Sequence, residues 1–422
     1  MLSNSLMNIG ICDKETSTYT SFLEYILAFL IIINCNTIYS QYISGVTLFG
    51  LISFVLILLI FSSGMSKVKI DMALFVYMFI IVYYSLPFFN IDDFSSQYRE
   101  LLYIATFFIT FPLFIIYFRV YRNNVRIFLV FSNLMAYISL MSFVLWLLCS
   151  ILKILPMSQF VLNHWASFDF VPSYYYIYFE TQKNVFLGIE TVRNSAFFSE
   201  APMFAICVSI AFAIEIMLRR RIRIYNVIFL ILGILSTTSV TAMILAIITL
   251  LMQRRLFIKT VILKGIITII AISASFIVIF TILEDKKVNN EQSYGTRMKH
   301  LQKGVLAFEK NTILGTGFYS QTKENSNSCL VLLSEMGIYG AFPFIWGLML
   351  KPLILSRQHG YYHVGMLFLV FFVGYCFTII TYCCLSLLFV SFMLSLKKII
   401  KYYFNDIQAF ISKVSNLIRI ID

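Results

Sequence analysis

The chain has 422 residues, of which 60% are hydrophobic and 12% are charged. Soluble domains usually carry about 25% charged residues, so this composition nearly excludes a water-soluble fold. The formal net charge of +12 raises nucleic acid as a possible partner. In a membrane protein, however, a basic excess is first interpreted as an orientation signal, so the positions of the charges decide its meaning.

Apolar runs of about 20 residues recur along the chain, and a helix of that length crosses the hydrocarbon core of a bilayer. They predict an all-α polytopic membrane protein with about twelve spans, at 21–40, 43–62, 70–88, 101–118, 127–152, 196–217, 224–237, 239–253, 261–283, 327–350, 361–379 and 381–396. The spans at 224–237 and 239–253 are short, with no charge between them. They form either one bent hairpin or two half-spans whose free backbone groups are satisfied inside the protein.

The basic residues of the short loops fall on one side of the predicted membrane. Fourteen lie in alternate loops: Lys67, Lys69, Arg119, Arg122, Arg126, Arg219, Arg220, Arg221, Arg223, Arg254, Arg255, Lys259, Lys351 and Arg357. The opposite short loops carry only Arg99. The positive-inside rule therefore places both termini in the cytoplasm and needs no nucleic acid to explain the charge.

This placement divides the chain into six parts. A first transmembrane bundle of about five helices (1–152) is followed by a long periplasmic loop (153–195), central transmembrane helices (196–283), a second long periplasmic loop (284–326), C-terminal transmembrane helices (327–396) and a cytoplasmic amphipathic tail (397–422). The tail is expected to lie along the anionic inner leaflet. Loops as long as these two are usually functional, so we expect the active site on the outer face.

The first long loop is rich in aromatic residues: Trp165, Phe168, Phe170, Tyr174, Tyr175, Tyr176 and Tyr178. Such rings form either an interfacial belt or a face that stacks on sugar rings, and the two are not exclusive. At the end of the loop, Arg193 precedes Glu200, which is predicted to lie one turn inside the membrane. An intramembrane carboxylate is by default a functional candidate. The alternative is an Arg193–Glu200 ion pair that only orients the loop.

The second long loop contains an amphipathic stretch with Arg297, Lys299 and His300 near its expected start. Cations at the start of a helix oppose the helix dipole and therefore suggest a bound anion. His300 is interpreted either as a base or phosphate donor or as a solvated helix residue. A glycine turn (314–318) and Asn327 follow, and residues 284–327 have seven Lys or Arg against five Asp or Glu. A basic outer loop fits a phosphate site at the membrane surface.

Other site types are disfavoured by the sequence. His359 and His363 have a spacing that can present two imidazoles to a metal, but no third ligand is near them. Nucleotide-binding and hydrolase motifs are absent from the sequence, so no metal or other cofactor is expected. A secondary transporter would show two related halves with matching polar breaks. The short pair of spans has no counterpart in the first half of the sequence.

Several of these motifs occur in a familiar order. The run Arg193-x-x-x-Phe197-Phe198-x-Glu200-x-Pro202 resembles the signature that opens a span in Wzy-type O-antigen polymerases and the related O-antigen ligases. The Ser/Thr-rich break at 235–242 is similar to the one that follows it. Then come Arg297, the Leu314-Gly315-x-Gly317 turn, Asn327, Glu335 and Gly337-Ile338-x-Gly340, as in the large periplasmic loop and next helix of that superfamily. The ligases have His where this chain has Ser326, which favours a polymerase.

The resemblance implies a metal-independent glycosyltransferase in the inner membrane, with its active site facing the periplasm. Undecaprenyl-pyrophosphate-linked glycans would be donor and acceptor, and a chain-length regulator protein is an implied partner beside membrane lipids. Arg193 and Arg297 would bind pyrophosphate, Glu200 would act as acid, base or Arg-orienting group, and the implied substrate contacts are Lys299, His300, Asn327, Trp165 and Tyr175. The alternatives are an O-antigen ligase, a capsule or exopolysaccharide polymerase, and less favourably a polysaccharide flippase.

Overall fold

A computed structural model describes residues 18–62, 101–102, 104–121, 125–164, 169–186, 189–253, 291–318, 320, 327–358 and 361–396. Most of this part of the chain is helical. The α-helices are α2 (Thr18–Ile33), α3 (Ile38–Tyr42), α4 (Gly45–Ser62), α7 (Phe111–Val120), α8 (Arg126–Leu145), α9 (Ala201–Met217), α10 (Ile224–Ser236), α11 (Val240–Met252), α13 (Glu291–Lys310), α14 (Ser328–Ile345), α15 (Lys351–Ser356), α16 (Tyr362–Cys376) and α17 (Cys384–Ser395). Three π-helical segments continue helices beside them: η3 (Ile104–Thr110), η4 (Trp146–Ile151) and η5 (Trp346–Leu350).

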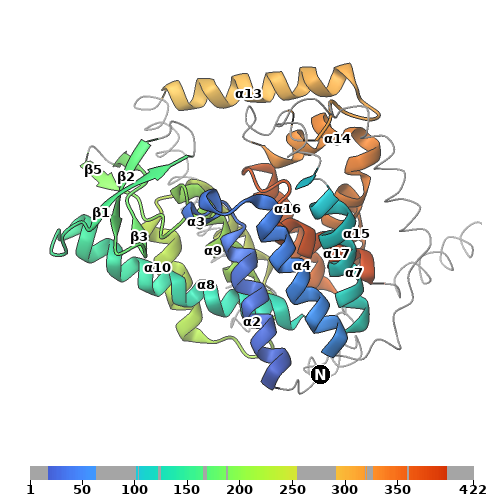
Figure 1. The fold of residues 1–422 in the computed structure, drawn as a ribbon, viewed down its shortest axis with the longest axis horizontal. Coiled ribbons are helices and arrows are strands. Elements are labelled where there is room, and N and C mark those ends of the chain that lie inside the picture. The colour runs from blue at the N-terminus through green and yellow to red at the C-terminus, as the bar shows by residue number, and fades with distance from the viewer. Residues whose placement is uncertain are drawn as a thin grey trace, which may run out of the picture.

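Helix α9 lies inside the bundle. Its side chains are apolar on nearly every side, and all of its residues except Pro202 are buried. A helix that is hydrophobic all round needs neighbours on all sides. Here α8, α10, α11 and α16 pack against it, while α2, α4 and α7 lie beside one another (Figure 1). Because Glu200 directly precedes α9, the position of this central helix also fixes the position of that residue.

Three helical stretches are long and apolar enough to cross a membrane: Gly45–Ser62, Arg126–Ile151 and Ser328–Ser356. Shorter apolar helices surround them, which indicates a membrane protein. Within the described residues, each predicted span overlaps an apolar helix, but the span predicted at 21–40 divides into α2 and α3. The spans predicted at 70–88 and 261–283, and the tail at 397–422, lie outside the described residues. The count of twelve spans therefore stays a prediction.

The all-α prediction is wrong in the first long loop, which forms two small antiparallel sheets. One contains β1 (Gln159–Asn163), β2 (Asp169–Tyr174) and β3 (Tyr178–Phe179), and the other contains β4 (Lys183–Phe186) and β5 (Ile189–Val192). Burial alternates along β1 and β2, as expected for strands with one face against the protein. An aromatic-rich composition does not by itself indicate the period of two that is typical of strands.

The two short spans are separate helices. Helices α10 and α11 have 13 residues each, so each is about 20 Å long, against a hydrocarbon core of about 30 Å. Helix α10 packs on α8 and α9, whereas α11 packs on α9 and α16. Each of the two helices is therefore shorter than a bilayer core, and the choice between a bent hairpin and two half-spans stays a prediction. The turn between them at 237–239 contributes to the candidate site.

Candidate active site

Arg193 and Glu200 meet the same glutamine side chain at one end of the bundle. Because Lys183 pairs with Val192, the β4–β5 hairpin places Gln182 beside Arg193. The amide oxygen of Gln182 accepts a hydrogen bond from Arg193 Nη1 at 3.4 Å, and its Nε2 donates to Glu200 Oε2 at 3.4 Å. Arg193 Nε donates to the carbonyl of Thr237 at 2.9 Å. A cation, a carboxylate and the break between α10 and α11 are thereby joined in one polar cluster.

Glu200 directly precedes α9, which begins later than the predicted span at 196–217. The helix begins at Ala201, and Glu200 is its N-cap residue with an extended backbone. Its carbonyl accepts a hydrogen bond from the N–H of Met203 at 3.2 Å, and the side chain is half-buried. A carboxylate at a helix N-terminus is stabilised in its ionised form by the helix dipole.

The segment between Arg193 and Glu200 is anchored to the turn between α10 and α11. The backbone N–H of Asn194 donates to the carbonyl of Ser236 at 3.1 Å. Its side-chain amide donates to the hydroxyls of Ser142 and Ser236 at 3.2 and 2.9 Å. Together with Arg193, Asn194 satisfies carbonyl groups at the end of α10 that lack a partner within the helix. Irregular backbone inside a membrane protein requires such partners, so the Arg193 segment also stabilises the break.

A second asparagine links this cluster to the C-terminal half of the chain. Asn36 has a positive φ of 55° in the turn between α2 and α3. Its carbonyl accepts hydrogen bonds from the N–H and the hydroxyl of Ser199, at 3.0 and 2.8 Å. Its amide donates to the carbonyl of Ile379 at 2.9 Å, and the N–H of Ile380 donates to Ser328 Oγ at 2.6 Å. The starts of α9 and α14 therefore lie at the same end, which we call the outer end.

The glycine turn after α13 fits tightly against a kink in α14. Gly337 interrupts the helical backbone of α14 with φ 61° and ψ −172°. The N–H of Gly317 donates to the carbonyl of Glu335 at 3.0 Å, and that of Ile338 donates to the carbonyl of Thr312 at 2.9 Å. A Cβ on Gly315 would lie 2.3 Å from the backbone carbonyl oxygen of Glu335. Two motifs of the resemblance thus hold each other in place and attach α13 to α14.

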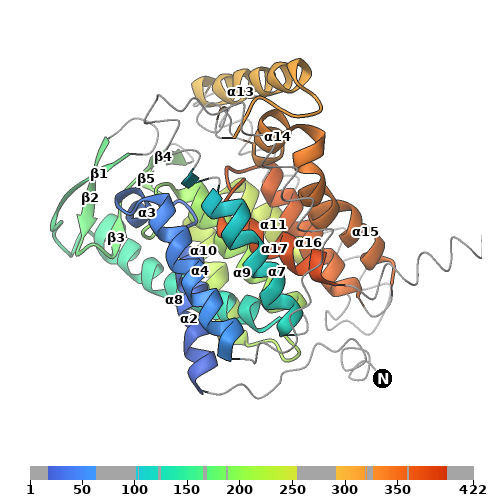
Figure 2. The same ribbon diagram turned by 45° about the vertical axis from the view of Figure 1, so that its right-hand side comes forward.

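Helix α13 carries three of the predicted site residues and lies beyond the outer end of the bundle (Figures 1 and 2). It begins at Glu291, so Arg297 is in its second turn and not near its start. The expected conflict with the helix dipole, which acts within the first turn, is therefore absent. Lys299 is exposed, whereas His300 is half-buried with its Nδ1 buried and without a hydrogen-bond partner in the described residues. The half-buried side chain of His300 therefore differs from the interpretation of His300 as a fully solvated helix residue.

The remaining predicted residues have other surroundings. Asn327 is the N-cap of α14, and its Oδ1 accepts a hydrogen bond from the N–H of Leu330 at 3.0 Å. Tyr175 is exposed in the turn between β2 and β3, where its N–H donates to Ser158 Oγ at 3.0 Å. Trp165 lies outside the described residues. The structure therefore brings together Arg193 and Glu200, while it shows a capping role for Asn327.

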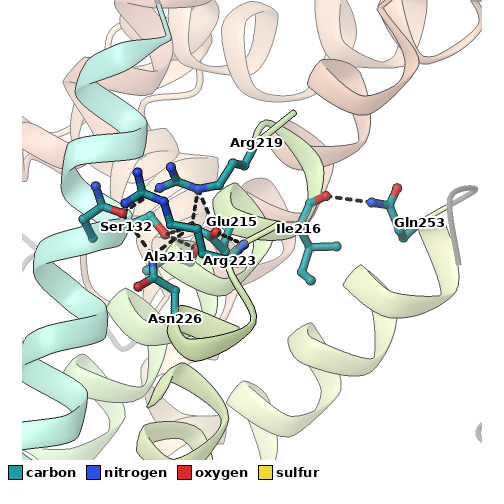
Figure 3. A network of polar contacts seen from close by, with 9 residues as sticks. Ser132, Ala211, Glu215, Ile216, Arg219, Arg223, Asn226 and Gln253 are labelled. Atoms are coloured by element: carbon teal, nitrogen blue, oxygen red, sulfur yellow. Dashed lines mark hydrogen bonds and ion pairs between the residues drawn. The ribbon is translucent and has the colours of Figure 1, made fainter. Parts of the chain in front are cut away.

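Two further buried carboxylates lie at the opposite, inner end of the bundle. Glu215 of α9 is within 2.7 Å of Arg219 Nε, and it accepts a hydrogen bond from Asn226 Nδ2 at 3.2 Å (Figure 3). Glu24 of α2 is within 2.7 Å of Arg126 Nε. Both carboxylates are fully buried. Because each is paired with an arginine, we assign them to helix packing, and sequence reasoning had singled out neither carboxylate.

Replacing Glu215 by leucine should strongly destabilise the protein. The guanidinium of Arg219 would stay buried without its counter-charge, which costs about 3–5 kcal/mol. Thermal unfolding in detergent measures the effect. Arg220→Leu is the matched control, because Arg220 is adjacent and exposed. The double variant Glu215→Leu/Arg219→Leu should recover part of the loss, and a single variant as stable as the parent would contradict the assignment.

The polar residues that organise the outer end were missed in the sequence, although a signal was present. Asn34 and Asn36 interrupt the apolar run 21–40, and polar groups inside a span need partners. Gln182 gave no such signal, because only the pairing of β4 with β5 brings it to Arg193.

The cluster can bind an anion through Arg193 and accept a proton at Glu200. No known protein family and no curated protein matches this sequence.

Proposed function

We propose that the chain is a membrane glycosyltransferase that joins lipid-pyrophosphate-linked oligosaccharide repeat units into a polysaccharide, as an O-antigen polymerase of the Wzy type. The observation that carries this proposal is the cluster of Arg193, Gln182, Glu200 and the Thr237 carbonyl at the outer end of the bundle. Three separate parts of the resemblance, the arginine, the glutamate and the Ser/Thr-rich break, contribute to it. The expected location is the inner membrane, with this end facing the periplasm.

The proposed reaction has one bond exchange. A hydroxyl oxygen at the non-reducing end of the acceptor unit attacks the anomeric carbon of the donor chain. The bond from that carbon to the pyrophosphate oxygen breaks, and undecaprenyl pyrophosphate leaves with the bonding electron pair. The hydroxyl proton passes to a base. Pyrophosphate is already a good leaving group, so catalysis requires mainly stabilisation of its charge and activation of the hydroxyl.

The residues of the cluster suit these two tasks. The guanidinium of Arg193 is oriented by Thr237 and Gln182, and an arginine fork can bind phosphate oxygens at two points. Glu200 is the best placed proton acceptor, because Gln182 orients its carboxylate next to the cation. Arg297, Lys299 and His300 on α13 supply a second set of cationic contacts in this proposal. A metal ion has no assigned role in it.

Gel analysis of lipopolysaccharide from a deletion strain tests the proposal. Loss of a polymerase leaves lipid A-core capped with a single repeat unit, whereas the parent shows a ladder of chain lengths. Loss of a ligase leaves no surface repeats, and loss of a flippase traps lipid-linked units in the cytoplasmic leaflet; either result would overturn the proposal. A complementing plasmid is the control. Purified protein should also extend lipid-linked repeat units in the presence of a metal chelator.

A further inference from the structure

One side of the β1–β2 pair exposes apolar side chains, and further along the same side Tyr174 and Tyr178 are buried against η4. In the β1–β2 pair, Phe160 is opposite Pro172 and Leu162 is opposite Phe170. Directly opposed residues project from the same side of a sheet, so these four side chains share one surface, which we call the apolar face. Phe160 is 57% exposed and Phe170 is 69% exposed. Antiparallel sheets that face water normally present polar residues on that side.

The other face of the sheet is fixed against the protein. Val161 and Val171 are buried there. The amide of Asn163 donates to the carbonyl of Ser199 at 2.9 Å, and Gln41 Nε2 donates to Asn163 Oδ1 at 2.8 Å. A shift of one residue in the pairing would exchange the two faces and break these contacts. The exposure of the apolar face is therefore determined by the packing of the buried face.

Hydrogen bonds fasten the sheet to the end of a candidate membrane span. The stretch Arg126–Ile151 is one of the three helices long enough to cross a membrane. In its last turn, Ser150 Oγ donates to Glu180 Oε1 at 2.7 Å and contacts the hydroxyl of Tyr178 at 2.8 Å. Trp146 Nε1 donates to the carbonyl of Val192 in β5 of the second small sheet at 2.7 Å. Both small sheets are thus held at the end of this candidate span.

These contacts do not loosen within the physiological pH range. Burial and the nearby charge of Glu180 raise the pKa of Tyr174 to about 12, and the same causes raise the pKa of Tyr178 still further. Both phenols therefore keep their protons at neutral pH. The hydroxyl of Tyr174 donates to Glu180 Oε1 at 3.1 Å.

Exposed apolar residues also occur on α8 and in the connection between η4 and β1. On α8, Tyr137, Met141 and Val144 are exposed at helical spacing. Leu152, Ile154 and Met157 are exposed in the connection that leads to β1. The sheet lies beside α3 at the outer end of the bundle in both ribbon views, whereas α13 lies beyond that end (Figures 1 and 2). Exposed apolar side chains thus occur on the candidate span, in the connection that follows it and on the apolar face of the sheet.

We propose that the apolar face is embedded in the lipid leaflet at the outer end of α8 and anchors the sheet at the membrane surface. An apolar patch beside a membrane span is covered by acyl chains without any further partner. A surface that recognises sugars combines rings with accessible polar groups that fix orientation. The four residues of the apolar face carry no polar side-chain group, and the hydroxyls of Tyr174 and Tyr178 on the same side are buried. Lys153 is exposed in the connection between η4 and β1, where a long basic side chain can reach lipid headgroups. This anchor does not depend on the proposed enzyme activity.

Site-directed fluorescence in vesicles tests the anchor. Phe160→Cys and Phe170→Cys, each labelled with an environment-sensitive dye on the thiol, should be quenched severalfold more strongly by phosphatidylcholine with a nitroxide near the glycerol than by a water-soluble quencher. Lys183→Cys is the matched control, because Lys183 is exposed at the start of the other small sheet. It should show the reverse order. The unsubstituted chain measures labelling of the native cysteines.

Two results would overturn the proposal. The first is quenching at positions 160 and 170 that follows the water-soluble quencher, as at position 183. The second is protection of these positions from labelling by soluble oligosaccharide, which would assign the apolar face to sugar binding. Using two labelled positions keeps the test decisive if one substitution impairs folding.

Discussion

Replacing Arg193 by alanine should reduce polymer formation about 100- to 1000-fold, the effect of removing one preorganised donor to a developing negative charge. The parent guanidinium is fixed by Thr237 and Gln182, so its charge needs no reorganisation as pyrophosphate departs. Cells carrying the variant should show lipid A-core with one repeat unit and no ladder. Densitometry of the lipopolysaccharide gel, with the variant expressed at the parental level, measures the effect.

Two further variants distinguish charge from geometry at this position. Arg193→Lys keeps the charge but cannot reproduce the planar fork that contacts Thr237 and Gln182 together, so it should remain clearly impaired. Gln182→Leu leaves the cation in place with its hydrogen bond to the Thr237 carbonyl and removes the hydrogen bonds of Gln182 to Arg193 and Glu200, so its loss should be smaller. A complete ladder from Arg193→Ala would exclude Arg193 from the reaction. Equal ladders from Arg193→Lys and the parent would reduce its role to that of a positive charge.

Replacing Gly337 by alanine should prevent α14 from adopting its kinked form. The backbone there has φ 61° and ψ −172°, a region that is essentially restricted to glycine and costs other residues about 1–3 kcal/mol. An added Cβ would also lie 2.2 Å from the carbonyl oxygen of Ile313, a backbone atom that cannot move aside cheaply. We expect loss of most of the folded protein, measured as the monodisperse fraction after size-exclusion chromatography in detergent.

The matched control is Gly50→Ala. Gly50 lies inside α4, and a Cβ there would meet nothing within 4 Å. Alanine is favoured over glycine inside a helix by about 1 kcal/mol, so the control should be as stable as the parent or slightly more so. Gly315→Ala should resemble Gly337→Ala, because the two glycines face the same contact from opposite sides. Normal folding of both variants would show that α13 is not attached through this turn.

The helices were predictable because membrane spans are long and apolar. Runs such as 43–62 and 127–152 coincide with α4 and with α8 plus η4 within a residue or two. The strands at 159–192 were not predicted, since short segments next to a span give a weak periodic signal. The break at 235–239 was recognised by composition. The sequence did not show that α10 packs on α8 and α9 while α11 packs on α9 and α16, because such contacts depend on the tertiary structure.

Part of the candidate site was also visible in the sequence. Arg193 and Glu200 are separated by only six residues, so their proximity required little tertiary information. By contrast, Asn36 meets Ser199 and Ile379 from positions far apart in the chain, and no local pattern specifies such contacts. The surroundings of the two glutamates at either end of α9 could not be predicted from the sequence either. Composition alone could not separate Glu200 from Glu215, which differs in being buried against Arg219.

The sequence by itself determined that this is a helical membrane protein, because its apolar runs are too long and its charges too few for a soluble fold. It also determined which motifs to examine. Only the tertiary structure decided that Gln182 joins Arg193 to Glu200, that Gly315 and Gly337 lock α13 onto α14, and that Phe160 and Phe170 project from one face of a sheet. These features depend on strand pairing and close contacts between distant segments, and such contacts leave no periodic trace in the residues that make them.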